Sequence, residues 1–85
     1  MFSHYTIPVK AEKKTVNAAA TLDTKGLFVK LLAESGDLWV CGPSQAPTAD
    51  SYPVKEGETL AFSGRLRVAA ANGPATVKLL YFDAV

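Results

Sequence analysis

The sequence predicts an all-β fold, a small antiparallel β-sandwich or jelly roll of about seven to eight short strands. Two observations indicate this class. Apolar and polar residues alternate along most of the chain, as in strands that bury one face. Turn-forming residues recur roughly every 8–12 positions, a spacing typical of sandwiches and barrels. No segment has a convincing helical period, so βαβ units, which need helical crossovers, are excluded.

The first part of the chain is predicted to lie at an edge of the sheet. Residues 1–12 are interpreted as an N-terminal arm or edge strand, because Pro8 has no amide hydrogen to donate to a neighbour. Residues 13–85 are assigned to a single sandwich domain, since 85 residues suffice for one domain. Within it, residues 13–22 fit a strand slightly better than a helix.

The middle of the chain contains the strongest strand pattern. Residues 26–33 alternate between two faces, residues 34–37 have the composition of a turn, and a short strand follows at 37–42. The segment 26–42 is therefore interpreted as a hairpin. Residues 43–53 contain three of the five prolines and no apolar pattern, which predicts a long loop.

The last third of the chain predicts three more strands. A tight turn at Glu56 and Gly57 precedes a short strand at 59–62, and residues 65–71 alternate cleanly. Asn72 and Gly73 then form a strong hairpin signal before the closing strand at 75–83.

Two of the predicted strands, 26–33 and 75–83, carry apolar residues on both faces. A two-layer sandwich covers only one face of each sheet, so the surplus needs a second cover. A loop or the N-terminal arm could supply it, but an interface between subunits is favoured because so short a chain has few spare residues. The sequence thus predicts a homo-oligomer, with a trimer favoured. The predicted interface residues are Phe2, Tyr5, Phe28, Leu32, Trp39, Tyr52, Leu80 and Phe82.

Composition narrows the classes of partner. The net charge is +1, with nine basic and eight acidic residues and no basic stripe, so nucleic acid is not an expected partner. No apolar run reaches the length of a membrane span, and the first residues do not resemble a signal peptide. The lone Cys41 fits a reducing cytosol. These features predict a soluble protein folded inside a cell.

Groups that could carry chemistry are few. His4 is the only histidine and stands near a terminus, so neither a four-ligand metal site nor a His-activated nucleophile is expected. Cys41 is interpreted as a buried structural cysteine, and Glu56 with Glu58 as parts of a solvated turn. The sequence therefore predicts no catalytic residues, no metal and no cofactor, and a protein that is not an enzyme.

From residue 26 onward, turn and core positions follow a recognisable order over about sixty residues. The residues that define this order are Gly36, Val40, Gly42, Tyr52, Gly57, Glu58, Leu60, Leu66, Val68, Ala70, Gly73, Val77 and Leu80. This order resembles that of small bacteriophage virion structural proteins, of the capsid-decoration or head-fibre type. The resemblance implies a non-enzymatic β-sandwich protein that self-assembles, commonly as a trimer, and binds the major capsid protein or another virion protein. It also implies assembly in the host cytoplasm and a location in the virion.

A second hypothesis is a binding module for carbohydrate or a host surface. The 43–53 loop would then form a site with the aromatic side chains of Trp39 and Tyr52, which are suited to stacking on sugars. Packing in a core or an interface is the competing interpretation of these aromatics.

Overall fold

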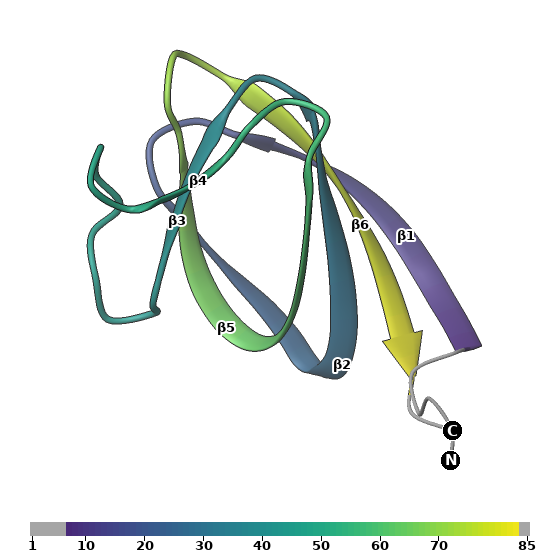
Figure 1. The fold of residues 1–85 in the computed structure, drawn as a ribbon. Helices are drawn as coiled ribbons and strands as arrows, with labels where there is room; N and C mark the ends of the chain where they lie inside the picture. Colours follow the sequence, from purple (N-terminus) through teal and green to yellow (C-terminus); the bar gives the residue numbers. More distant parts are fainter. Residues whose placement is uncertain (1–6, 84–85) are drawn as a thin grey trace.

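The computed structural model describes residues 7–83, and these form strands without any helix. All strand pairs are antiparallel, and the strand order in the sheet is β1-β6-β2-β5-β3-β4 (Figure 1). The predicted all-β antiparallel class is confirmed. Within residues 7–83 there is consequently no helix long and apolar enough to cross a membrane. The six strands are β1 (Ile7–Val16), β2 (Ala20–Ser35), β3 (Leu38–Cys41), β4 (Tyr52–Val54), β5 (Thr59–Ala70) and β6 (Ala75–Asp83).

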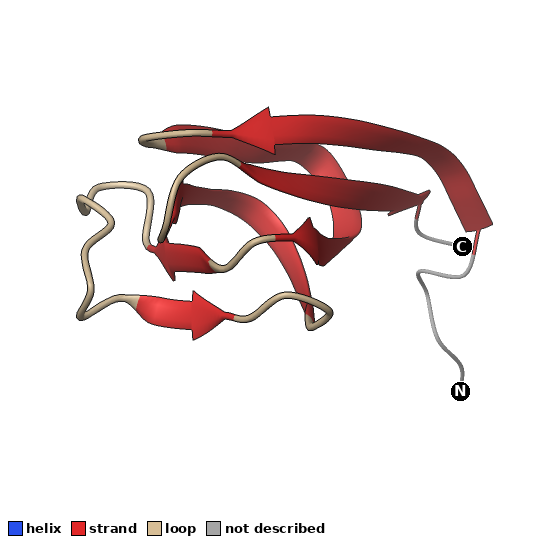
Figure 2. Ribbon diagram, turned by 90° about the horizontal axis from the view of Figure 1, so that it is seen from above, coloured by secondary structure: helices blue, strands red, loops and turns tan. Residues whose placement is uncertain are grey.

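Two long strands, β2 and β5, bend in the middle and fold the sheet into two layers (Figure 2). Lys25 and Gly26 have φ values of 53° and 85°, and Gly64 has a φ of 104°, a region that glycine adopts without steric cost. Layer A contains β1, β6, the second half of β2 and the first half of β5. Layer B contains the first half of β2, the second half of β5, β3 and β4. Six strands rather than seven to eight suffice because two of them serve both layers.

The core lies between the layers and is built by alternate residues of each strand. Leu31, Leu38, Val68 and Val77 have no solvent exposure at all. Burying a side chain of this size stabilises the fold by about 1.5–3 kcal/mol. Together the inward residues form one continuous cluster: Val16, Leu22, Val29, Leu31, Ala33, Leu38, Val40, Val54, Leu66, Val68, Ala75, Val77, Leu79 and Tyr81.

The two predicted hairpins are wrong. Strands β2 and β3 are separated in the sheet by β5, so the segment 26–42 is not a hairpin. Strands β5 and β6, which flank Asn72 and Gly73, are separated by β2. Each of these turns carries the chain from one layer to the other. Within residues 7–83, only the long loop after β3 joins two strands that pair with each other, β3 and β4.

The segment 13–22 is also not one strand. Strand β1 ends at Val16 and β2 begins at Ala20, because the chain changes layers between them. Conversely, the segments predicted at 59–62 and 65–71 belong to one strand, β5, that continues through the bend at Gly64. Residues 7–12 are the first part of β1, which is an edge strand paired only with β6.

Candidate functional site

A polar pocket of about 190 Å³ lies between the edge strand β1, the bend of β2 and the end of β6. We call it the seam pocket, because β1 belongs to layer A and the first half of β2 to layer B. It is smaller than the pockets of about 300–1,000 Å³ that hold drug-sized ligands, so it suits a small molecule or ion. Its lining consists of Lys10, Glu12, Lys14, Asp23, Thr24, Lys25, Leu27 and Tyr81.

The strand period explains why charged residues line an inward surface. In β1, Lys10, Glu12 and Lys14 alternate with outward residues and lie opposite Tyr81, Leu79 and Val77 of β6. The β6 residues are buried and point toward the other layer. The three charged side chains therefore start from the same face of the sheet as the core. They remain largely in contact with solvent because β1 is at the edge.

Tyr81 and Glu12 form a partly buried polar contact in the pocket. The phenol of Tyr81 donates a hydrogen bond of 2.7 Å to Oε1 of Glu12. The Nζ of Lys10 lies 3.6 Å from Oε2 of Glu12 and 4.6 Å from the centroid of the Tyr81 ring. The hydrogen bond from Tyr81, aided by Lys10 and Lys14, lowers the pKa of Glu12 below its usual value. Burial and the Glu12 carboxylate raise the pKa of Tyr81 to about 12.

The opposite wall of the pocket is held by backbone hydrogen bonds. Oδ1 of Asp23 accepts the amide hydrogen of Lys25 at 2.8 Å, closing a local turn that suits the positive φ of Lys25. Thr24 is almost fully buried, and its Oγ1 accepts the amide hydrogen of Gly64 at 2.8 Å. That bond joins the bend of β2 to the bend of β5, so the two bends position this wall together.

The charges of the pocket are unbalanced. Three lysine ammonium groups face two carboxylates, a net charge of +1. Lys10 is paired with Glu12, and one oxygen of Asp23 is used by the backbone. Among the ion pairs of residues 7–83, none within 4.0 Å involves the Nζ of Lys14 or Lys25. These two ammonium groups could bind an anion.

Metal ligands do not gather in the part of the chain that is described. Residues 7–83 contain no group of three or more His, Cys, Asp or Glu side chains that could hold a metal ion. Structural and catalytic zinc sites need at least three such protein ligands. The seam pocket contributes only Glu12 and Asp23.

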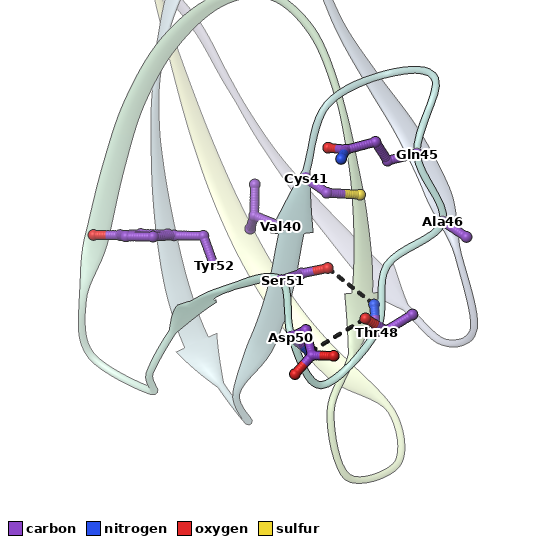
Figure 3. Close-up of a pocket in the computed structure, with 8 residues that line it drawn as sticks. All are labelled: Val40, Cys41, Gln45, Ala46, Thr48, Asp50, Ser51 and Tyr52. Atoms are coloured by element: carbon purple, nitrogen blue, oxygen red, sulfur yellow. Dashed lines mark hydrogen bonds between the residues drawn. The ribbon is translucent and has the colours of Figure 1, made fainter.

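A second pocket, of about 440 Å³, lies beside the loop that joins β3 to β4 (Figure 3). Its polar groups are largely used to shape the loop. Oε1 of Gln45 accepts the amide hydrogen of Gly42 at 3.0 Å, and Oγ of Ser51 accepts that of Thr48 at 2.9 Å. Oγ1 of Thr48 in turn accepts the amide hydrogen of Asp50 at 3.2 Å. Asp50 is the only charged residue of the lining, so the pocket lacks a cluster of like charges, and we regard it as the weaker site.

The structure does not combine Trp39 and Tyr52 into one site. Trp39 lies opposite Pro53 and Tyr52 lies opposite Val40, so the two aromatic side chains start from opposite faces of layer B. Tyr52 lines the loop pocket, as predicted, although its ring points away from Gln45, whereas Trp39 does not line it (Figure 3). The prediction that both aromatics share one site with the loop is therefore wrong, because Trp39 and Tyr52 occupy adjacent register positions of β3 and β4, and adjacent positions alternate between faces.

Four other predicted interface residues do come together. Phe28, Leu32, Leu80 and Phe82 lie on the outer face of layer A, with Phe28 and Phe82 side by side in the register. Leu80 is 36% exposed, and the other three are partly buried. Phe2, Tyr5 and His4 lie outside the described residues.

Two smaller predictions are revised. Cys41 is only half-buried and lines the loop pocket, because odd-numbered residues of β3 face away from the core. Glu56 and Glu58 are exposed, as predicted for a turn, but both carboxylates accept backbone hydrogen bonds. Oε1 of Glu56 accepts the amide hydrogen of Gly36, and Oε1 of Glu58 accepts that of Lys55, both at 2.8 Å.

Sequence reasoning missed the seam pocket altogether. The signal was present in the alternation of Lys10, Glu12 and Lys14, three charged residues on one face of an edge strand. Such alternation usually marks a solvated face, and the identity of the opposing strand was not predictable from it. The contact with Tyr81 joins residues 69 positions apart.

Comparisons with known proteins show the fold and nothing narrower. The sequence matches no protein-family model and no curated protein. Among solved structures, protein NMB1881 from Neisseria meningitidis matches 96% of this chain and 89% of its own, with a TM-score of 0.69 and 15% identity. A cupin-2 domain containing protein from Shewanella frigidimarina matches 93% of this chain and 82% of its own, with a TM-score of 0.64 and 10% identity.

A transcriptional regulator of the HTH_3 family from Vibrio cholerae is also similar, with a TM-score of 0.64 and 14% identity. The match covers 85% of this chain but only 41% of the regulator, so this chain corresponds to less than half of that protein. A de novo designed double-stranded β-helix matches with a TM-score of 0.60 and 18% identity. The fold is therefore of the cupin, or double-stranded β-helix, type.

This result corrects the expected function. The similar structures are cupin-type and regulator proteins, and no phage-related protein was found among them, so the assignment to bacteriophage virion proteins is wrong. The resemblance rested on turn glycines such as Gly36 and Gly73, which have positive φ, and on core residues such as Val68 and Val77. A double-stranded β-helix needs the same residue types at similar spacing. The predicted capsid partner and virion location depended on that resemblance alone.

The fold does not decide whether the chain is an enzyme. A candidate mannose-6-phosphate isomerase from Ralstonia eutropha has this fold, with a TM-score of 0.59 and 14% identity, and so does the Vibrio regulator. One fold can host unrelated functions, so function must be argued from the site.

Proposed function

We propose that this chain is a non-catalytic binding domain of cupin fold that holds a small anion in the seam pocket. The observation that carries the proposal is the pair of ammonium groups of Lys14 and Lys25, which line the pocket without an ion-pair partner within residues 7–83. Ligands commonly bind in the mouths of barrel-like folds, and a cluster of one charge sign attracts the opposite charge.

The donors of the pocket suit oxyanions. A lysine ammonium group offers three hydrogens, and the hydroxyl of Thr24 can donate its hydrogen while its oxygen accepts from Gly64. Leu27 provides an apolar side to the same space. A ligand with a carboxylate or phosphate group and a short carbon skeleton matches this combination and the volume of about 190 Å³.

Binding is favoured over catalysis because of the protonation states in the pocket. A general acid or base works best when its pKa lies near the working pH. Here the pKa of Glu12 is lowered and that of Tyr81 is raised to about 12. At neutral pH the carboxylate stays ionised and the phenol stays protonated, so their hydrogen bond is a structural contact rather than a proton shuttle.

The test is isothermal titration calorimetry at low ionic strength with inorganic phosphate, malonate and citrate. We expect saturable binding of at least one of them by the wild type, and about tenfold or greater weakening in Lys14→Gln and Lys25→Gln, since removing a charge-assisted hydrogen bond costs about 1.5–3 kcal/mol. Lys55→Gln is the matched control, because Lys55 pairs with Asp37 outside the pocket. Absence of binding to all three anions, or equal binding by the double variant, would show the proposal to be wrong.

A further inference from the structure

The seam pocket contains carboxylates as well as ammonium groups. Strand β1 supplies Lys10, Glu12 and Lys14, and the bend of β2 supplies Asp23 and Lys25. An anion bound by the lysines in a space of about 190 Å³ would also lie close to both carboxylates, and like charges at short range repel each other. A ligand with a cationic group of its own would be attracted where a simple anion is repelled.

Glu12 is already occupied by groups of the chain. Its Oε1 accepts the phenol hydrogen of Tyr81 at 2.7 Å, and its Oε2 lies 3.6 Å from the Nζ of Lys10. The ion pair of Lys10 and Glu12 has no net charge. Three charged groups of the lining then remain without an ion-pair partner within residues 7–83: the ammonium groups of Lys14 and Lys25, and the carboxylate of Asp23.

Asp23 offers one carboxylate oxygen to a ligand. Its Oδ1 accepts the amide hydrogen of Lys25 at 2.8 Å, which fixes the carboxylate relative to the bend. No hydrogen bond or ion pair formed among residues 7–83 involves its Oδ2. An ionised carboxylate accepts hydrogen bonds on both oxygens, and those from cationic donors are the stronger kind. Oδ2 of Asp23 can therefore bind an ammonium group of a ligand.

We propose that the ligand of the seam pocket is a small zwitterionic α-amino acid. This inference rests on the proposed function and narrows its ligand class. The carboxylate of the amino acid would bind the ammonium groups of Lys14 and Lys25, and its ammonium group would bind Oδ2 of Asp23. A short apolar side chain of the ligand would contact Leu27, the partly buried aliphatic residue that lines the same space.

Charge and size distinguish this class from related ligands. A dianion would be attracted by the two lysines but repelled by Asp23 and Glu12, whereas an amine without a carboxylate would meet a pocket of net charge +1. A zwitterion has no net charge and presents each sign to its opposite. The volume of about 190 Å³ lies below the range of about 300–1,000 Å³ for drug-sized ligands, which favours an amino acid with a short side chain.

Isothermal titration calorimetry of the full chain with three matched ligands tests the inference without any variant. L-Valine carries both charges, 3-methylbutanoate has the same carbon skeleton without the ammonium group, and 2-methylpropylamine lacks the carboxylate. At low ionic strength we expect valine to bind at least tenfold more tightly than either analogue. Valine that does not bind, or that binds no more tightly than 3-methylbutanoate or the amine, would overturn the inference.

Asp23→Asn tests the residue that distinguishes an amino acid from a simple anion. The amide oxygen can still accept the hydrogen of Lys25, so the turn is kept while the charge is removed. We expect at least tenfold weaker binding of valine, and unchanged or tighter binding of 3-methylbutanoate because a repelling charge is gone. Asp50→Asn is the matched control, since Asp50 is an exposed residue of the loop pocket, and it should leave both affinities unchanged. Equal weakening of both ligands in Asp23→Asn would contradict the inference.

The proposed function and this inference fail in different ways. If phosphate or malonate binds and Lys14→Gln weakens its binding, but valine binds no better than 3-methylbutanoate, the anion site is supported and the amino acid is wrong. If Lys14→Gln and Lys25→Gln leave the binding of valine unchanged, its carboxylate is not held by these lysines, and both are wrong. The comparison of the three ligands with the wild type decides the matter even if Asp23→Asn fails to fold.

Discussion

The phenol of Tyr81 donates a hydrogen bond of 2.7 Å to the carboxylate of Glu12, and so joins the closing strand β6 to the edge strand β1. Tyr81 is 7% exposed, whereas the side chain of Glu12 is 36% exposed. The contact marks the boundary between the apolar core and the seam pocket. It also makes the protonation of both groups depend on folding.

Ionisation of Tyr81 should destabilise the fold at high pH. The ordinary pKa of tyrosine is 10.0, and in the folded chain it is raised to about 12. The folded state therefore holds this proton more tightly than the unfolded state. The stabilisation should be complete below pH 10 and disappear as the pH rises through 12. Ultraviolet titration of the phenols should show a late component that Tyr81→Phe removes; its persistence in that variant would contradict the assignment.

Ionisation of Glu12 should affect the stability of the fold at acidic pH. Its pKa in the folded chain is below the ordinary 4.5, so its contribution to stability is present above pH 4.5 and is lost as the pH falls through the folded value. We expect Glu12→Gln to lower the melting temperature at pH 7 and to lose this effect at low pH. Melting curves recorded from pH 3 to 7 by circular dichroism would show it. A constant difference across that range would argue against ionisation as the cause.

Removing the hydroxyl of Thr24 should loosen both bends. Its Oγ1 is the acceptor for the amide hydrogen of Gly64 in a partly buried hydrogen bond, and a typical hydrogen bond contributes about 0.5–1.5 kcal/mol to stability. Thr24→Val keeps the shape of the side chain but not the acceptor, so we expect a loss of that size in chemical denaturation. Thr24→Ser, which keeps the hydroxyl, should retain most of the stability. Equal losses in the two variants would point to packing instead.

Two glycines with the same backbone conformation should respond differently to alanine. Gly36 and Gly57 have φ values of 86° and 88°. A Cβ at Gly36 would lie 3.1 Å from that of Ala75, whereas nothing lies within 4 Å of one at Gly57. Gly57→Ala should cost about 1–2 kcal/mol for the left-handed backbone alone. Gly36→Ala should cost more, because overpacking adds about 1–3 kcal/mol. Urea denaturation of both variants would measure their losses of stability. Equal losses would contradict the close contact expected between a Cβ at position 36 and Ala75.

Neighbouring leucines of β6 provide a test of the layer assignment. Leu79 is 2% exposed and faces the core, while Leu80 is 36% exposed on the outer face. Leu79→Ala should cost about 2–5 kcal/mol, as large-to-small core substitutions do. Leu80→Ala, measured at micromolar concentration, should cost about 1 kcal/mol or less. The opposite ranking would mean that the inner and outer faces of layer A are exchanged.

The all-β class and most strand and turn positions could be predicted because they depend on local chemistry. Alternation along β6 separates Val77 and Leu79 from Lys78 whatever strand lies beside it, and the glycines at 36, 57 and 73 mark turns because they have positive φ. The apolar surplus at Phe28, Leu80 and their neighbours was visible for the same reason. These are properties of short segments, and a two-residue period is enough to reveal them.

Strand pairing was decided by the tertiary structure. The turn at Asn72 and Gly73 looks the same in sequence whether the next strand pairs with the previous one or crosses to the other layer. The crossing is favoured here because β2 and β5 bend at Gly26 and Gly64 and let one sheet enclose its own core. The seam pocket follows from that closure. Lys14 and Lys25 meet only because the edge of one layer lies against the bend of the other, a contact that no local pattern encodes.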